Sequence, residues 1–281
     1  MADWIPFGLT EREAEAYAVL RSDLSLASKQ SVVAWILPLF DEGGGLANSL
    51  AVRRLQLVTD TFLGVGPTGA RTNLAGVTAT INQLSDVQIL RLADYALSQT
   101  SSVPRQNALE LILKAARSKW TVGTRMGRPG LMERVPVGVQ EFAESAISSS
   151  GKAGSVLSRA WTEIHGLEQQ PSAAYADAVV AVEIVAVAAV QPSNSAATLG
   201  TVIAQMELRN DWRLPLREHG KAPSAELVIA MLRTLWYGHR DRHGKADYSS
   251  VSPEEARAAV SLAVVAVDWF ASGVLARRPL T

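Results

Sequence analysis

Residues 173–190 constrain the fold of this 281-residue chain more than any other segment, because they alone approach a membrane span in length and apolarity. Alanine, valine and isoleucine dominate the stretch, and Asp177 and Glu183 are its only charged residues. A membrane-spanning helix needs about 20 predominantly apolar residues, and carboxylates are costly in lipid. We therefore expect this stretch to be the buried central helix of a bundle.

Almost every other segment also has a helical pattern. Apolar residues recur at helical spacing, and capping boxes begin at Thr10, Ser85 and Ser252. The helices expected are residues 14–20, 31–40, 47–62, 89–97, 104–116, 139–147, 154–165, 225–238 and 256–275, in addition to the central stretch. Only residues 120–125 resemble a short strand or an extended loop. The sequence thus predicts an all-α protein with an N-terminal helical region, 1–147, a linker at 148–151 and a C-terminal helical domain, 152–281.

Composition limits the cellular setting and the bulk electrostatics. The 27 basic residues equal the 27 acidic ones, so any contact with nucleic acid must come from a local patch. The chain contains no cysteine, which excludes disulfides and thiolate metal sites and is in keeping with a reducing cytosol. The first residues lack a basic segment followed by an apolar one, so we expect a cytoplasmic protein.

Residues 233–244 concentrate the chemistry of the chain. They contain two of its four histidines, His239 and His243, and three arginines, Arg233, Arg240 and Arg242. Histidine titrates near neutral pH and can move protons, whereas the arginine fork fits phosphate oxygens. This combination suggests phosphodiester chemistry or phosphate binding. The other interpretation is a capped helix end followed by a solvated basic turn.

The order of segments around this cluster resembles a known family. One helix ends near Leu232 and Arg233, a His-Gly pair follows at His243, and a long helix returns after Ser252. Residues 174–183 and 198–203 match the family's first two helices. Over residues 150–278, the chain is similar to the C-terminal domain of abortive-infection proteins in the HEPN superfamily, which contains helical ribonucleases and nucleotide-binding domains.

The resemblance implies a metal-independent endoribonuclease or RNA-binding effector in phage defence. The superfamily motif is an arginine, four to six residues and a histidine, which Arg233 and His239 satisfy, whereas the family's glycine follows His243. Either histidine is thus a candidate for the catalytic one. The implied catalytic residues are Arg233, His239, Arg240 and His243, with Glu183 as a carboxylate facing them, and Arg242 and Lys245 would bind nucleic acid. No cofactor is implied. The implied partners are RNA, a second copy of the chain in a homodimer and an antitoxin or phage-derived trigger, but no membrane.

Two other functions remain open for the same bundle. One is a non-catalytic module that dimerises or serves as a scaffold, because a shared fold does not fix function. The other is a nucleotide-sensing module in which Arg233 and Arg240 hold phosphates.

A second basic segment lies in the N-terminal region. Its residues that suit single-stranded nucleic acid, through phosphate contacts and base stacking, are Lys119, Trp120, Arg125 and Arg128. The alternative is an ordinary solvated loop.

Two other motifs are weaker. His239 and His243 have a spacing that could ligate zinc from a helix, but flanking glycines and three arginines oppose it, so we expect no metal. Residues 64–70 fit the glycine pattern of a dinucleotide site. A helix rather than a strand is expected before them, which favours an interhelical loop.

Overall fold

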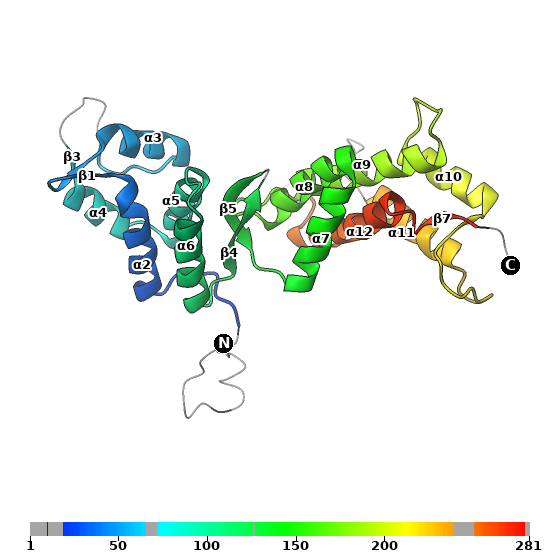
Figure 1. Ribbon diagram of the computed structural model, residues 1–281, viewed down its shortest axis with the longest axis horizontal. Helices are drawn as coiled ribbons and strands as arrows, with labels where there is room; N and C mark the ends of the chain where they lie inside the picture. The colour runs from blue at the N-terminus through cyan, green and yellow to red at the C-terminus, as the bar shows by residue number, and fades with distance from the viewer. Residues whose placement is uncertain (1–9, 11–18, 66–71, 126, 239–249, 279–281) are drawn as a thin grey trace. The chain divides into compact units, whose positions relative to one another are not determined.

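The computed structural model describes residues 10, 19–65, 72–125, 127–238 and 250–278. Within these residues the protein is predominantly helical, with eleven α-helices and several short strands (Figure 1). The chain divides into two compact units, Met1–Arg134 and Val135–Thr281. The all-α expectation is therefore confirmed at the level of fold class, apart from the short strands.

The first unit contains five described helices and a β-hairpin. Its helices are α2 (Leu26–Ile36), α3 (Ser49–Thr59), α4 (Leu74–Asn82), α5 (Asp86–Ser98) and α6 (Val103–Ala115), and the 3₁₀ turn η1 (Leu37–Leu39) follows α2. Its strands are β1 (Asp41–Gly43), β2 (Leu46–Ala47) and β3 (Thr72–Asn73), which form one small sheet, and β4 (Trp120–Arg125) and β5 (Arg128–Glu133).

Polar side chains define where these helices begin. The side chains of Ser25, Asn48, Asn73, Ser85 and Ser102 each accept a backbone N–H from the first turn of the next helix. Such caps satisfy donors that have no partner within the helix, and each stabilises its helix by about 1 kcal/mol. The helix starts in this unit are therefore encoded locally.

Helix α5 is the core helix of the first unit. It packs against α2, α3 and β5, and its buried residues are Ile89, Leu90, Leu92, Ala93, Ala96 and Leu97. These residues recur at three- and four-residue steps, so they form the apolar face that the sequence predicts.

The strands β4 and β5 form an antiparallel hairpin in which Trp120 lies opposite Glu133 and Arg125 opposite Arg128. Gly127, with φ +76°, occupies the turn in the left-handed region that favours glycine. Of the two possibilities for residues 120–125, the strand is the correct one.

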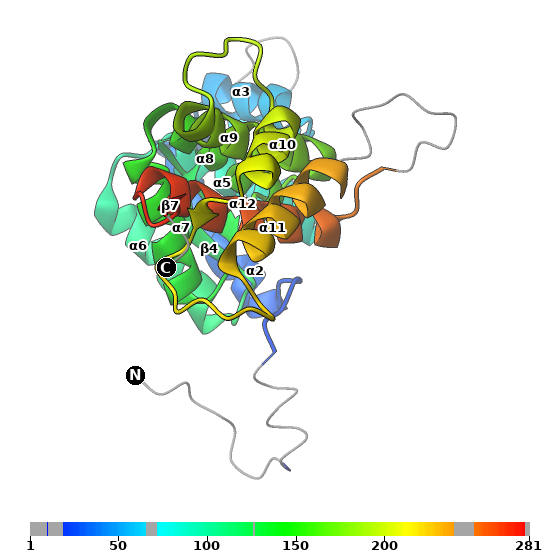
Figure 2. The ribbon, with the colours of Figure 1, turned by 90° about the vertical axis from the view of Figure 1, so that its right-hand side faces the viewer.

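The second unit is a helical bundle. Its helices are α7 (Val137–Ser149), α8 (Gly151–His165), α9 (Pro171–Val190), α10 (Leu199–Arg209), α11 (Ser224–Gly238) and α12 (Pro253–Ala271), and the short strands β6 (Trp212–Arg213) and β7 (Ala276–Arg277) pair antiparallel. Figure 2 shows the helices α7 to α12 from a second direction.

Helix α9 is the central helix of the second unit, as its apolar sequence predicts. It packs against α8, α10 and α12, and small residues such as Ala174, Ala178, Ala181 and Ala186 are fully buried along it. By length and composition, α9 alone among the helices of the described residues is apolar enough to cross a membrane. The packing of α8, α10 and α12 against α9 explains the same apolar sequence as that of a bundle's core helix.

The boundary between the units differs from the expected one. Residues 148–151 are not a linker, because α7 ends at Ser149 and α8 begins at Gly151. Gly151 has φ +54°, which allows the chain to turn within one residue. Helix α7 packs against α8 and α12 and therefore belongs to the second unit.

Three other expectations shift or lie outside the described residues. The helix expected over 47–62 ends at Thr59, because Asp60 adopts a left-handed conformation. Helix α4 was not expected, and it follows the strand β3 rather than residues 64–70 directly. Residues 66–71 of the dinucleotide-like pattern and most of the helix expected at 14–20 lie outside the described residues.

Candidate functional site

The described part of the candidate site is the carboxyl end of α11. Arg233 lies there with about half of its side chain exposed, and its Nη2 is 2.6 Å from Oε1 of Glu207 on α10. The pair fixes the direction of the arginine and neutralises its charge in part. An exposed ion pair stabilises a fold by only about 0–1 kcal/mol, so a phosphate group can compete for this arginine.

Tyr175 of α9 anchors this helix end. Its hydroxyl donates a hydrogen bond to the carbonyl oxygen of Leu235 at 3.1 Å and lies 3.5 Å from that of Thr234. The last carbonyls of a helix have no partner within it, so the buried phenol satisfies one of them.

Two glycines allow the close packing around this end. A Cβ added at Gly238 would lie 2.4 Å from the Tyr175 hydroxyl oxygen, and one added at Gly200 of α10 would lie 3.0 Å from the Trp236 ring. An added Cβ would displace the Tyr175 hydroxyl at Gly238 and would make a tight contact with the Trp236 ring at Gly200. The last residues of α11 are therefore held from two sides.

The start of α12 approaches the same tyrosine. Ser252 and Glu255 form the predicted capping box, in which Ser252 Oγ accepts the N–H of Glu255 and Glu255 Oε2 accepts the N–H of Ser252. Burial raises the pKa of the Tyr175 phenol, and the negative charge of Glu255 adds to this shift. The end of α11 and the start of α12 thus meet near one residue of α9.

The segment between these two helix ends carries most of the candidate residues. His239, Arg240, Arg242, His243 and Lys245 lie outside the described residues, as does any continuation of α11 through Arg240. The structure does show that Arg233 lies in the last turns of α11 and that Gly238, next to His239, contacts Tyr175. The described end of α11 therefore carries Arg233 and stops one residue before His239 in the sequence.

Glu183 has a different contact from the one expected. Its Oε2 accepts the backbone N–H of Leu199 at 2.7 Å, at the first position of α10. Free N–H groups and the helix dipole attract a carboxylate to such a site. Glu183 thus caps α10, and Arg233 binds Glu207 instead. The other residues that Glu183 was expected to face lie outside the described residues.

Asp177, the other acid of α9, also has a structural partner. It forms a two-point ion pair with Arg159 of α8, with 2.7 Å between Nη2 and Oδ1. An ionised partner stabilises a carboxylate on a largely buried helix.

Glu163 of α8 was missed by the sequence analysis. Burial raises its pKa to about 6, the negative charge of Asp177 adds to the shift, and Arg159 opposes it. Its Oε2 is buried and has no hydrogen-bond partner among the described residues. No sequence pattern points to Glu163, because it approaches Asp177 only when α8 packs on α9.

The basic segment of the N-terminal region is a structured hairpin, and its expected aromatic platform is not accessible. Trp120 is only 6% exposed, and Lys119 Nζ lies 4.8 Å from the centre of its ring. A buried indole cannot stack on a base, so this part of the expectation is wrong. Arg128 is exposed at the start of β5 and remains able to contact a phosphate.

Arg125 supports the hairpin rather than presenting a free charge. Its Nη2 is 2.5 Å from Oδ2 of Asp94, whose Oδ1 accepts the N–H of Leu131. A Cβ at Gly130 would lie 2.3 Å from Arg125 Nε, so this glycine lets the side chain cross β5 toward α5. Two acids neutralise this segment in part. Asp94, which pairs with Arg125, lies 31 residues earlier in the sequence, and Glu133, which lies 3.9 Å from Lys119, is on the facing strand β5.

The two remaining histidines do not extend the candidate site. His165, the last residue of α8, is buried, with its ring centre 4.2 Å from that of Trp161. His219 is exposed, and its Nδ1 accepts the N–H of Lys221. Across the described ranges, no group of three or more His, Asp or Glu side chains is arranged to hold a metal ion.

Comparison of the chain with models of known families, with curated proteins and with solved structures finds no match in any of the three.

Proposed function

We propose that the protein is a metal-independent endoribonuclease that acts as an effector in phage defence, with a HEPN-like bundle in its second unit. The observation that carries this proposal is the position of Arg233, exposed in the last turns of α11 and separated from His239 by five residues. This is the spacing of the superfamily's nuclease motif. The anchoring of the helix end by Tyr175 supports it, because a catalytic segment needs fixed supports.

The chemistry would be an attack within the RNA chain. A neutral histidine accepts the proton of a ribose 2′-hydroxyl while its oxygen forms a bond to the adjacent phosphorus. The bond from phosphorus to the 5′-oxygen breaks, and a protonated group, the second histidine, gives that oxygen a proton. Arg233 and Arg240 stabilise the negative charge that accumulates on the phosphoryl oxygens, an effect that is usually the largest single term in catalysis.

The proposal includes a homodimer in the cytoplasm. Twofold pairing is the commonest oligomer, and it would bring two copies of residues 233–244 together. Arg242, Lys245 and Arg128 would add phosphate contacts to RNA. An antitoxin or a phage-derived trigger would control the activity.

One observation favours the second candidate, a non-catalytic scaffold or nucleotide-sensing module. Arg233 is paired with Glu207, and in a scaffold this pair would simply hold α10 against α11. Nucleotide binding without RNA cleavage would support this second function.

The deciding experiment is RNA cleavage in EDTA by the wild type and by His239→Ala and His243→Ala. Removal of a catalytic histidine should lower the rate about 100- to 10,000-fold, the usual contribution of general acid–base catalysis, without changing thermal stability. His219→Ala is the matched control, because His219 is an exposed histidine of the same unit. The nuclease proposal fails if the wild type cleaves no RNA tested, or if both variants cleave as fast as the control.

A further inference from the structure

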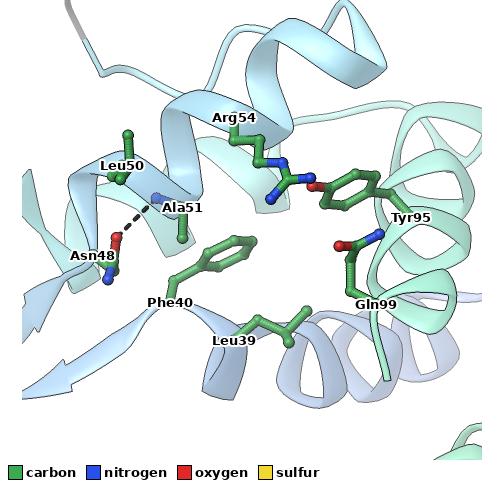
Figure 3. Close-up of a pocket in the computed structure, with 8 residues that line it drawn as sticks. All are labelled: Leu39, Phe40, Asn48, Leu50, Ala51, Arg54, Tyr95 and Gln99. Carbon is green, nitrogen blue, oxygen red and sulfur yellow. Dashed lines mark hydrogen bonds between the residues drawn. The ribbon is translucent and has the colours of Figure 1, made fainter. Parts of the chain in front are cut away.

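The first unit contains a pocket that the proposed nuclease chemistry does not use. Its volume is ≈ 340 Å³, within the lower part of the ~300–1,000 Å³ range of small-molecule sites. It lies among η1, α3 and α5 (Figure 3). The residues that line it are Leu39, Phe40, Asn48, Leu50, Ala51, Arg54, Tyr95 and Gln99.

One side of this pocket is apolar. The ring of Phe40 forms its floor and is itself 3% exposed, so its position is fixed by the core of the unit. Leu39 and Ala51 extend this surface, and Leu50, which is 79% exposed, forms the rim. An apolar group that covers these side chains would gain about 25 cal/mol for each Å² removed from water.

The other side of the pocket presents hydrogen-bond donors. Figure 3 shows the guanidinium of Arg54, the hydroxyl of Tyr95 and the amide of Gln99 gathered there. The Gln99 amide nitrogen donates a hydrogen bond to Ser98 Oγ, and the amide oxygen is turned toward the other lining residues (Figure 3). Within the described part of the chain, Arg54 has no acidic partner and the Tyr95 hydroxyl has no hydrogen bond.

The charge of the lining selects the ligand class. Arg54 is the only charged residue among the eight, and none is acidic. The first turn of α3, capped by Asn48 Oδ1 on the N–H of Ala51, adds the positive end of its helix dipole. A guanidinium fork and a phenol O–H together match the oxygens of a carboxylate.

We propose that this pocket binds a small amphipathic carboxylate, whose apolar body covers Phe40 and Ala51 and whose carboxylate is held by Arg54 and Tyr95. The volume suits a single aromatic ring with a short chain. This inference concerns the first unit and does not depend on the nuclease proposal.

Three probes with one apolar body test the ligand class on the full chain. They are 3-phenylpropionate, 3-phenylpropanol and 3-phenylpropylamine, titrated separately with backbone amide NMR shifts as the readout. The carboxylate should bind with a Kd of about 0.1 to several mM, as expected for about eleven non-hydrogen atoms, and at least about tenfold more tightly than the alcohol. The amine should bind weakest, and the largest shifts should fall on Ala51, Tyr95 and Gln99.

Matched variants then locate the anion contact. Arg54→Gln should reduce the affinity for 3-phenylpropionate to that for the alcohol and leave the alcohol unchanged. Arg53→Gln is the matched control. It also removes one positive charge from α3, but Arg53, the residue before Arg54, does not line the pocket, so this variant should keep the preference for the carboxylate. Melting curves confirm that both variants fold.

The proposal is overturned by any of three results: no shifts at these residues with 10 mM 3-phenylpropionate, equal binding of the three probes, or an unchanged preference in Arg54→Gln. Acetate binding as tightly as 3-phenylpropionate would also overturn it, because the apolar side would then contribute nothing.

Discussion

The hydroxyl of Tyr175 donates to the carbonyl of Leu235 across 3.1 Å, and this bond ties the central helix α9 to the carboxyl end of α11. The hydroxyl oxygen is the only polar atom in the Tyr175 side chain, and the residue is 6% exposed. His239, the first candidate histidine, follows Leu235 by four residues in the sequence. This bond therefore contributes to holding the described end of α11 against α9.

Tyr175→Phe should lower the free energy of unfolding by about 1 kcal/mol, since it removes the donor and leaves a buried carbonyl without it. Urea denaturation measures this change. Tyr237→Phe is the control, because Tyr237 is 71% exposed on α11 and should change stability by less than about 0.5 kcal/mol. Equal effects of the two substitutions would show that the bond does not hold the helix end.

Gly238→Ala should destabilise the second unit by about 1–3 kcal/mol, because the new methyl group would lie 2.4 Å from the Tyr175 hydroxyl oxygen in a packed region. Gly220→Ala, where an added Cβ meets nothing within 4 Å, is the matched control. In the double variant Tyr175→Phe, Gly238→Ala, the hydroxyl that causes the clash is absent. The loss of unfolding free energy in the double variant should therefore be smaller than the sum of the losses in the two single variants. Simple additivity in urea denaturation would contradict this contact.

Glu163→Gln should stabilise the protein at pH 7. The folded-state pKa of Glu163 is raised to about 6 from 4.5, so its stabilising contribution is fully present below about pH 4.5 and is lost as the pH rises through 6. The difference in Tm between variant and wild type should therefore be largest above pH 6.5 and disappear near pH 4. Glu168→Gln is the control, because Glu168 is an exposed residue shortly after α8. A Tm difference between Glu163→Gln and the wild type that does not change with pH would contradict the raised pKa of Glu163.

Glu183→Ala should destabilise the fold by about 1 kcal/mol through loss of the cap on α10. Glu183→Gln keeps an acceptor for the Leu199 N–H and should lose less. Because this role is structural, the rate of RNA cleavage per folded molecule should be unchanged in both variants. A large loss of rate in Glu183→Gln with normal stability would restore the catalytic role that the sequence suggested.

The sequence predicted most helices because their signals are local. Capping residues such as Ser85 and Ser252 mark helix starts within four residues, and the apolar length of 173–190 identifies the central helix. The false linker at 148–151 has the same origin: serine and glycine are typical of linkers, but here Gly151 turns the chain between two packed helices. Whether such a turn separates domains depends on tertiary contacts that composition does not encode.

The candidate site was less predictable, because partners distant in sequence decide what each charge does. Asp94 binds Arg125 across 31 residues, and Glu207 binds Arg233 across 26. Only the fold shows that Trp120 is buried and that Glu183 caps a helix. The clustering of His and Arg identified a candidate segment of the chain. It did not predict the contacts of Tyr175 with Leu235 and Gly238 at the carboxyl end of α11, where that segment begins.

The central claim is tested most directly by the ends of the RNA that the protein produces in EDTA. Attack by the 2′-oxygen predicts fragments with 2′,3′-cyclic phosphate and 5′-hydroxyl ends, and a 2′-deoxy substitution at the cleaved nucleotide should abolish cleavage there. His239→Ala or His243→Ala should suppress the same products, while His219→Ala should not. Products with 5′-phosphate ends, cleavage that survives the 2′-deoxy substitution, or no cleavage of any RNA would contradict the account.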